Sequence, residues 1–183
     1  MKRAVFLDRD GVINEPVLEN GRAVAPTVLD DFVFIPGIHQ FARALRDAGF
    51  SIVVVTNQPD VVYKNLDVNV VDSMHALIRS EIPVDDILAC FHADKDNCLC
   101  RKPKPGMLFS AARDMDLDLG NSFMIGDTWR DMQAGKAANC RTILLNRDFG
   151  ITRLEAADVV VRNFGEALLH IRQWPHPVGI REP

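Results

Sequence analysis

Short runs of apolar, largely β-branched residues recur along the chain, and longer stretches with the apolar spacing of an amphipathic helix lie between them. Runs of this length and composition predict β-strands. Because they are apolar at successive positions, the strands are expected to be buried on both faces, which is typical of a parallel sheet. The predicted strands span residues 4–7, 51–55, 87–91, 122–125, 142–145 and 158–161.

The stretches between the predicted strands indicate helices. Ile38, Phe41, Ala42 and Leu45 are spaced as on one helix face, and Gly49 marks the end of that helix. The alternation of strand and helix predicts an α/β fold with an open, doubly wound parallel sheet and helices on both of its faces. The other predicted helices lie within residues 70–82, 105–115, 128–138 and 164–174.

The length of 183 residues, with 48% apolar residues, allows one sizeable core and leaves little room for a second full domain. We therefore expect a single domain over residues 1–174. Three prolines within residues 175–183 predict a flexible C-terminal tail. Residues 11–36 carry turn residues and little periodicity, which predicts a loop or a small hairpin near the site.

The formal net charge of −4 is modest, and lysine and arginine are scattered along the chain. A nucleic-acid or anionic-membrane surface would need a basic stripe, so neither partner is expected, and a small soluble ligand is favoured. The first apolar run stops at Asp8, too early for a signal peptide or a membrane span. The expectation is a cytoplasmic protein that acts as a monomer.

Polar side chains follow several predicted strands at the point where each strand ends. Asp8 and Asp10 follow the first strand, Thr56 and Asn57 the second, and Asp127 the strand over residues 122–125. In an open parallel sheet these positions meet at one edge, where ligands bind. Carboxylates gathered there would repel one another unless a divalent cation lay between them, and oxygen ligands suit magnesium. A magnesium site is therefore predicted.

The same group of residues suits the chemistry of a phosphoryl group. A hydroxyl at Thr56, an amide at Asn57 and the cation of Lys102 would surround its oxygens. Asp8 would then attack phosphorus, while Asp10 protonates the leaving oxygen and later activates water. Taken singly, each residue has an ordinary alternative, because acidic and hydroxyl residues after strands often cap the next helix.

A histidine and three of the four cysteines lie close together in the sequence. Cys90 and His92 are separated by one residue, as are Cys98 and Cys100. Because cytoplasmic thiols stay reduced, this spacing indicates a metal site before a disulfide. Three thiolates and one imidazole complete tetrahedral zinc with no open position, so the zinc would be structural. We also expect this loop to fix Lys102, which follows it directly.

Taken together, these motifs resemble the haloacid dehalogenase superfamily and, more closely, its zinc-containing branch. The segments that carry the resemblance are 6–14, 56–58, 101–103 and 125–127 with the cysteine and histidine set, and the similarity extends over residues 2–161. The resemblance implies a capless Rossmann-like domain and a phosphatase activity. It implies that Asp8 accepts the phosphoryl group and that Asp10 is the acid/base.

The resemblance also assigns binding roles. The magnesium ligands would be Asp8, the main-chain carbonyl of Asp10, and Asp127. Thr56, Asn57 and Lys102 would hold the phosphoryl group, and Arg101 would contact the substrate. The zinc ligands would be Cys90, His92, Cys98 and Cys100.

The zinc-containing branch includes heptose bisphosphate 7-phosphatases and histidinol-phosphate phosphatases, and the chain has features of both. Residues 101–108 look like the heptose enzymes, whereas the short spacing from His92 to Cys98 looks like the histidinol enzymes. Both kinds carry a basic residue after the final Gly-Asp, where this chain has Thr128, and residues 59–63 lack the glycine and arginine of the heptose enzymes. The expected substrate is a sugar phosphate such as D-glycero-D-manno-heptose 1,7-bisphosphate, and histidinol phosphate is the alternative.

Two alternatives come from other functional classes. A phospho-receiver signalling domain also gathers aspartates, a threonine and a lysine on a parallel sheet, but its accepting aspartate lies in mid-chain. A zinc-stabilised binding protein without activity is disfavoured by the intact Asp8, Asp10, Lys102 and Asp127. Asp131 is expected either behind the magnesium ligands or as an acid in the first turn of a helix.

Overall fold

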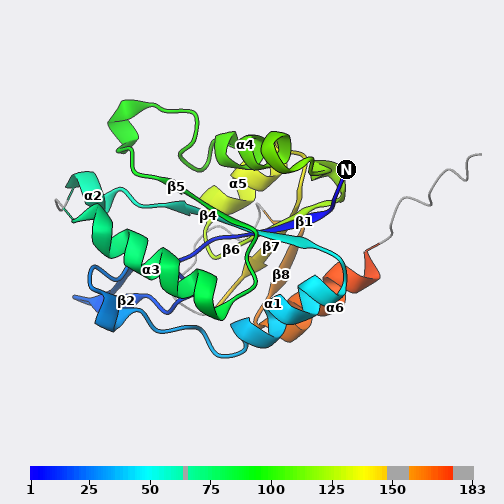
Figure 1. Cartoon of the computed structure of the whole chain (residues 1–183), viewed down its shortest axis with the longest axis horizontal. Helices are drawn as coiled ribbons and strands as arrows, with labels where there is room; N and C mark the ends of the chain where they lie inside the picture. The colour runs from blue at the N-terminus through cyan, green and yellow to red at the C-terminus, as the bar shows by residue number, and fades with distance from the viewer. Residues whose placement is uncertain (64–65, 148–156, 175–183) are drawn as a thin grey trace, which may run out of the picture.

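The computed structural model describes residues 1–63, 66–147 and 157–174. At its centre lies a six-stranded sheet in the order β5-β4-β1-β6-β7-β8 (Figure 1). Every neighbouring pair of strands in this sheet is parallel, as predicted. The strands are β1 (Ala4–Leu7), β4 (Ser51–Asn57), β5 (Asp86–Cys90), β6 (Phe123–Gly126), β7 (Arg141–Leu145) and β8 (Val159–Val161).

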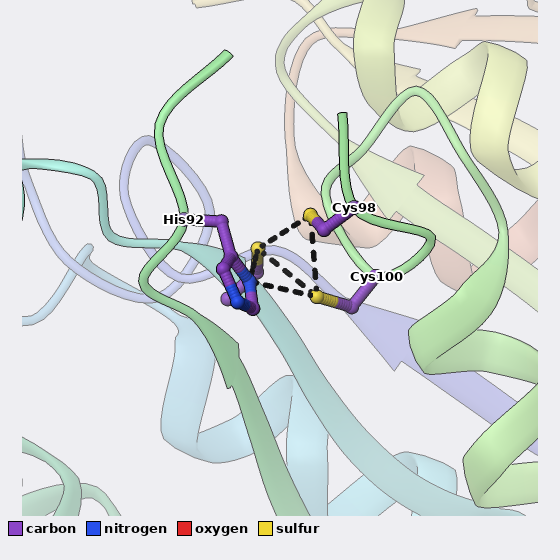
Figure 2. A group of neighbouring side chains, drawn as sticks. His92, Cys98 and Cys100 are labelled. Atoms are coloured by element: carbon purple, nitrogen blue, oxygen red, sulfur yellow. Dashed lines mark hydrogen bonds between the residues drawn. The ribbon is translucent and has the colours of Figure 1, made fainter. Parts of the chain in front are cut away.

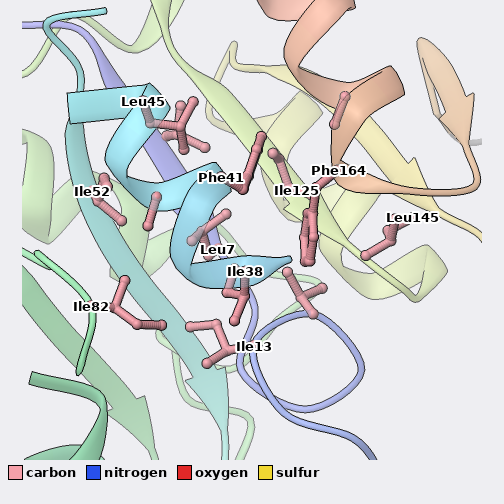
Figure 3. Close-up of a cluster of buried hydrophobic side chains, with 14 of the residues drawn as sticks. Leu7, Ile13, Ile38, Phe41, Leu45, Ile52, Ile82, Ile125, Leu145 and Phe164 are labelled. Carbon is pink, nitrogen blue, oxygen red and sulfur yellow. The ribbon is translucent and has the colours of Figure 1, made fainter. Parts of the chain in front are cut away.

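Helices cover both faces of this sheet, which confirms the predicted doubly wound α/β architecture. On one face, α1 (Ile38–Asp47), α3 (Val68–Glu81) and α6 (Phe164–Gln173) contribute their buried residues to the larger of two core clusters (Figure 3). On the other face, α4 (Gly106–Met115) and α5 (Trp129–Ala137) pack over the second cluster. Among the described helices, none is long and apolar enough to cross a membrane.

The continuous apolar runs of the strands result from this two-sided burial. In β1, Val5 and Leu7 belong to the larger cluster, whereas Ala4 and Phe6 belong to the second. Successive side chains of a strand point to opposite faces, so a strand covered on both sides needs an apolar residue at every position. All four side chains are fully buried.

The strand order determines where a ligand can bind. From β1 the chain passes to β4 and β5 on one side, and it then returns to β6, β7 and β8 on the other side. The carboxyl end of β1 therefore lies at a topological switch point, where open α/β sheets form a crevice for ligands. Residues that end β1, β4 and β6 meet there.

The smaller elements surround this end of the sheet. Between β1 and α1 lies an antiparallel hairpin, β2 (Val17–Glu19) and β3 (Arg22–Val24), which confirms the hairpin alternative for residues 11–36. The short helix α2 (Asp60–Tyr63) has no counterpart among the predicted elements, because four residues cannot show a helical period. The predicted tail, residues 175–183, lies outside the described residues. The 3₁₀ turns are η1 (Leu29–Asp31), η2 (Asp94–Asp96) and η3 (Leu119–Asn121).

Candidate active site

A pocket of about 470 Å³ lies at the switch point, at the carboxyl ends of β1, β4 and β6. Asp8 and Asp10 follow β1, Asp127 follows β6, and Lys102 reaches the pocket from the segment before α4. The hairpin and α2 also contribute to its wall. The volume falls within the range of small-molecule sites, so the pocket can hold a metabolite.

Three carboxylates converge in this pocket. Asp8, Asp127 and Asp131 each offer an oxygen, and these oxygens lie within 4.8 Å of one another. Burial and the neighbouring charge of Asp131 raise the pKa of Asp8 well above its usual value, and the same causes raise the pKa of Asp127 to about 7. Oδ1 of Asp127 is buried without a hydrogen-bond partner among the described residues. This oxygen-rich, negatively charged set fits a hard divalent cation such as magnesium.

Gly11 makes the close approach of the chain to this cluster possible. Its φ is +83°, in the left-handed region that favours glycine, and a Cβ there would lie 2.0 Å from Oδ2 of Asp127. A larger residue would therefore push the Asp127 carboxylate out of place.

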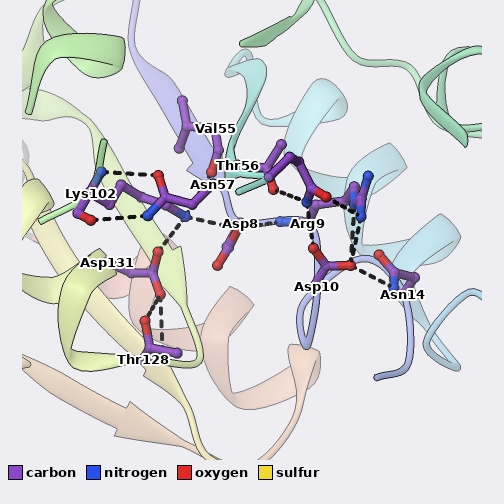
Figure 4. A network of polar contacts seen from close by, with 11 residues as sticks. Asp8, Arg9, Asp10, Asn14, Val55, Thr56, Asn57, Lys102, Thr128 and Asp131 are labelled. Carbon is purple, nitrogen blue, oxygen red and sulfur yellow. Dashed lines mark hydrogen bonds and ion pairs between the residues drawn. The ribbon is translucent and has the colours of Figure 1, made fainter. Parts of the chain in front are cut away.

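Lys102 neutralises part of the negative charge. Its Nζ lies 2.8 Å from Oδ1 of Asp8 and 2.5 Å from Oδ1 of Asp131, and it donates to the Val55 carbonyl at 2.8 Å (Figure 4). Although burial alone lowers the pKa of Lys102, the two carboxylates raise it above its usual value. The side chain is only 2% exposed. The ammonium group therefore has three close partners, and a phosphoryl oxygen has to share or replace one of them.

The side-chain amide of Asn57 forms two hydrogen bonds with the main chain of Lys102. Its Nδ2 donates to the Lys102 carbonyl at 3.0 Å, and its Oδ1 accepts from the Lys102 N–H at 3.0 Å. The pair of hydrogen bonds ties the end of β4 to the lysine segment. Asn57 lines the pocket, but its amide is used for placing Lys102, so its predicted contact with the phosphoryl group stays a prediction.

Thr56 and Asp10 are joined through one amide, that of Gln58. Thr56 is fully buried, and its Oγ1 accepts from Gln58 Nε2 at 2.8 Å. The same Nε2 donates to Oδ2 of Asp10 at 2.7 Å. The carboxylate of Asp10 thus lies outside the three-carboxylate cluster, whereas that of Asp131 lies inside it. Because Gln58 fills an acceptor site of Thr56, the hydroxyl proton is left to donate elsewhere.

Asp131 is the acid in the first turn of α5, one of its two predicted places, and its carboxylate also belongs to the three-carboxylate cluster. Its Oδ2 accepts from the hydroxyl of Thr128 at 2.5 Å and from the Thr128 N–H at 3.1 Å, which caps the start of α5. Its Oδ1 pairs with Lys102. One fully buried carboxylate therefore fixes both the helix and the lysine.

Two arginines lie on the wall of the pocket. Arg101 Nε donates to Oδ1 of Asp94 at 2.6 Å, and its Nη1 is buried without a hydrogen-bond partner among the described residues. The hydrogen bond from Arg101 lowers the pKa of Asp94, and the charge of Arg130 acts in the same direction. The N–H of Asp94 donates to the hydroxyl of Tyr63 at 3.0 Å. Both guanidinium groups can meet an anionic part of a ligand.

The predicted zinc ligands gather in the loop between β5 and α4 (Figure 2). The Sγ atoms are 3.2 Å apart for Cys90 and Cys100, 3.5 Å for Cys98 and Cys100, and 3.7 Å for Cys90 and Cys98. Nδ1 of His92 lies 3.3 Å from the sulfur of Cys100 and 3.5 Å from that of Cys90. With zinc–sulfur bonds of about 2.3 Å, the edges of a tetrahedron are about 3.8 Å. The four groups therefore fit zinc with little movement.

Arg9 and Gln58 carry no role in the sequence-based prediction, although both stand inside its motifs. Arg9 is fully buried and Gln58 is 2% exposed, and both contact Asp10. The available signal was Arg9 itself, since an arginine directly after a buried strand needs an anionic partner.

The chain is similar in sequence to a known family and to proteins of named activity. The HAD-hydrolase-like family matches residues 99–167. A D-glycero-beta-D-manno-heptose-1,7-bisphosphate 7-phosphatase from Pseudomonas aeruginosa is 34% identical over 155 residues, which cover 82% of this chain and 84% of the relative. A D-glycero-alpha-D-manno-heptose-1,7-bisphosphate 7-phosphatase from Burkholderia mallei is 38% identical over 174 residues, which cover 88% of this chain and 89% of the relative.

The solved structures agree with these relatives. A D,D-heptose 1,7-bisphosphate phosphatase from B. bronchiseptica, crystallised with magnesium and phosphate, superimposes with a TM-score of 0.77 at 29% identity. The match covers 93% of this chain and 98% of that one. The chain therefore belongs to the haloacid dehalogenase superfamily of phosphatases, in the same family as these heptose bisphosphate 7-phosphatases.

Proposed function

We propose that the chain is a magnesium-dependent phosphomonoesterase that passes the phosphoryl group through Asp8. The observation that carries the proposal is the place of Asp8 at the switch point of the sheet. Its Oδ1 accepts from the Arg9 N–H at 2.7 Å and pairs with Lys102, and the carboxylates of Asp127 and Asp131 lie beside it. A fixed carboxylate at this position is suited to be a nucleophile.

The reaction has two steps in this proposal. In the first, an oxygen of Asp8 forms a bond to phosphorus while the bond from phosphorus to the leaving oxygen breaks, and that oxygen takes a proton from Asp10. In the second, Asp10 takes a proton from water as the water oxygen attacks phosphorus, and the bond from phosphorus to Asp8 breaks. Phosphate leaves, Asp8 is free, and Asp10 is protonated again.

Magnesium, when bound, supplies positive charge to the phosphoryl oxygens and orients them for attack. The proposed ligands are Asp8, Asp127 and the main-chain carbonyl of Asp10, and Asp131 completes the carboxylate set. The unsatisfied Oδ1 of Asp127 supports this proposal. The solved relative from B. bronchiseptica was crystallised with magnesium and phosphate.

We also propose that Cys90, His92, Cys98 and Cys100 hold a structural zinc ion. The spacing of their ligand atoms supports the proposal, and four protein ligands leave no position for a substrate. Zinc would fix the loop in which Asp94 lies between His92 and Cys98. Mass spectrometry of the native chain tests this proposal, with one zinc per chain expected and Cys98→Ser as the matched variant.

The substrate that we propose is D-glycero-D-manno-heptose 1,7-bisphosphate, cleaved at the 7-phosphate. The relatives carry this substrate in their names, as both the alpha and the beta anomer. With the donors of Lys102 engaged, Arg101 and Arg130 are the guanidinium groups on the pocket wall that can bind a second phosphate. Histidinol phosphate, the alternative, has no second phosphate. It would instead bring its cationic amino group towards these arginines, which is unfavourable.

A panel of substrates tests the proposed substrate, and a variant of Asp8 tests the proposed nucleophile. Both anomers of the heptose bisphosphate, hexose bisphosphates and histidinol phosphate are ranked by kcat/KM at saturating magnesium. A bisphosphate is expected to rank first, and a preference for histidinol phosphate would reverse the assignment. Asp8→Asn is expected to abolish phosphate release. A phospho-receiver domain would instead keep an aspartyl phosphate for many minutes, so rapid turnover excludes that alternative.

We further infer that the protein is a monomer of the cytoplasm. The gathering of Cys90, Cys98 and Cys100 with His92 as a candidate metal site supports this location, since thiols stay reduced in the cytoplasm. Light scattering after gel filtration, with a mass of 20.4 kDa expected, tests the monomer.

A further inference from the structure

The carboxylate of Asp10 is held by a network whose members have no role in the proposed reaction so far. Arg9 donates to its Oδ1 through Nε at 3.2 Å and through Nη2 at 3.0 Å (Figure 4). Asn14 Nδ2 donates to the same oxygen at 3.1 Å. Oδ1 of Asp10 thus accepts three N–H groups, and no site is left on it for a proton or a ligand.

Gln58 fixes the other oxygen of the carboxylate. Its Nε2 donates to Oδ2 of Asp10 at 2.7 Å, and its Oε1 accepts from Arg9 Nη2 at 2.9 Å. The opposite orientation of the amide would set its oxygen against the carboxylate and its NH₂ against the guanidinium. The network therefore has one arrangement, and Oδ2 of Asp10 keeps room for one further partner.

Burial makes this arrangement rigid. Arg9 is fully buried and Gln58 is 2% exposed, whereas the Asp10 side chain is 20% exposed and lines the pocket. Gln58 also lines the pocket, but Asp10 is the more exposed of the two and thus the member of the network that a substrate can reach most readily. A buried guanidinium without an anion would be costly, so Arg9 ties the carboxylate to a fixed place beside the core.

We infer that Arg9 and Gln58 are positioning residues of the phosphatase reaction, which hold Asp10 so that Oδ2 alone meets the leaving group and the attacking water. This inference rests on the proposed acid/base role of Asp10. A general acid has to lie within about 2.6–3.2 Å of the oxygen that it protonates. A displacement of about 1 Å can slow such a step by about 100-fold, and a loosened carboxylate would be displaced by that amount.

Two substrates with different leaving groups can show whether Arg9 and Gln58 position Asp10 or only stabilise the fold. A sugar alkoxide needs a proton from Asp10, whereas p-nitrophenolate leaves readily without one. In Arg9→Met and Gln58→Met, kcat for the sugar phosphate is expected to fall by about 100-fold with KM within about threefold. The first step on p-nitrophenyl phosphate, measured as a stopped-flow burst of p-nitrophenolate, is expected to stay within about threefold of wild type. The second step still needs Asp10, so the burst should be followed by a slowed steady state.

The controls distinguish this role from a general loss of structure. Arg46→Met breaks another arginine–aspartate pair, to Asp85 at 2.6 Å, outside the residues that line the pocket, and should lower the melting temperature without changing the ratio between the two substrates. Arg9→Lys keeps the charge but not the two-pronged contact, and should restore part of the rate on the sugar phosphate. If Arg9→Met does not fold, Gln58→Met decides the question.

Two outcomes would overturn the inference: an equal loss of the first step on both substrates in folded variants, or no loss on the sugar phosphate. Failure of the proposed function looks different. In that case Asp8→Asn retains turnover of both substrates.

Discussion

Replacing Asp131 with alanine is expected both to destabilise the fold and to slow the reaction. The same carboxylate caps α5 and holds Lys102 in the proposed active site. Asp131 is fully buried, pairs with Lys102 at 2.5 Å, and accepts two hydrogen bonds from Thr128. Asp131→Ala removes all three interactions. The ammonium of Lys102 is then left with Asp8 and the Val55 carbonyl.

The expected loss of stability follows from these partners. Breaking a buried ion pair from one side costs about 3–5 kcal/mol, and the low end applies here because Asp8 still faces Lys102. Loss of the helix cap alone costs about 1 kcal/mol, which Thr128→Ala measures separately. Together the two losses come to about 4 kcal/mol, which corresponds to a fall in melting temperature of about 8–16 °C for a domain of this size. Asp131→Asn, which keeps an acceptor for Thr128, should fall between Thr128→Ala and Asp131→Ala.

Urea unfolding and turnover of the substrate are the two assays. We expect Asp131→Ala to lower kcat by about 10–100-fold, as for other residues that orient a ligand set without touching the substrate. Asp114→Ala is the control, because its pair with Arg113 lies on the surface and should contribute nothing measurable. The reasoning is refuted if Asp131→Ala unfolds within about 1 kcal/mol of wild type, since a buried charge pair cannot be removed so cheaply.

Three further predictions test other parts of the structure. Gly11→Ala should weaken activation by magnesium by about 10–100-fold through the clash with Asp127, whereas Gly21→Ala, with a φ of +74° and no atom within 4 Å, should leave the magnesium titration unchanged. Removal of zinc by a chelator should raise KM for a bisphosphate more than it lowers kcat, because the loop positions Arg101; an unchanged KM with zinc shown to be absent would contradict this. Burial lowers the pKa of His75 from 6.5 to about 4, so the unfolded chain gains the proton first and stability falls as the pH drops from 6.5 toward 4. His75→Asn should flatten this part of the urea-midpoint profile, and a profile parallel to that of wild type would count against the shift.

Much of the fold could be predicted because the burial of the strands leaves a direct mark on the sequence. A strand covered on both faces needs an apolar side chain at each position, and β1 shows this over its whole length and β4 over residues 52–55. The strand boundaries differ from the prediction by a residue or two, as at β5, which spans Asp86–Cys90 instead of residues 87–91. α2 and the 3₁₀ turns could not be predicted in this way. They are too short to show the apolar spacing by which a helix is recognised in a sequence.

The site was predictable where chemistry depends on residue type and strand position alone. Asp8, Asp127 and Lys102 meet as expected, because the ends of parallel strands converge. The contact partners of individual side chains could not be predicted in this way, because they depend on rotamers and on segments distant in the sequence. Gln58 turns inward to Asp10 and Arg9, and Asn57 turns to the backbone of Lys102, although the two stand side by side in one motif.

The chemistry and the recognition of substrate come from different parts of the fold. The proposed nucleophile Asp8, the proposed acid/base Asp10 and the residues that hold Asp10 stand on the ends of β1 and β4, next to a packed core that tolerates little change. The groups suited to a second anion, Arg101 and Arg130, stand next to the proposed zinc ligands and on the first turn of α5, at the rim of the pocket. Asp94 pairs with Arg101 at 2.6 Å, and Arg101 and Arg130 both line the pocket. Under the proposed mechanism, changes at the rim can therefore alter which phosphate ester is bound, while the residues that hold Asp10 keep the reaction at Asp8 the same.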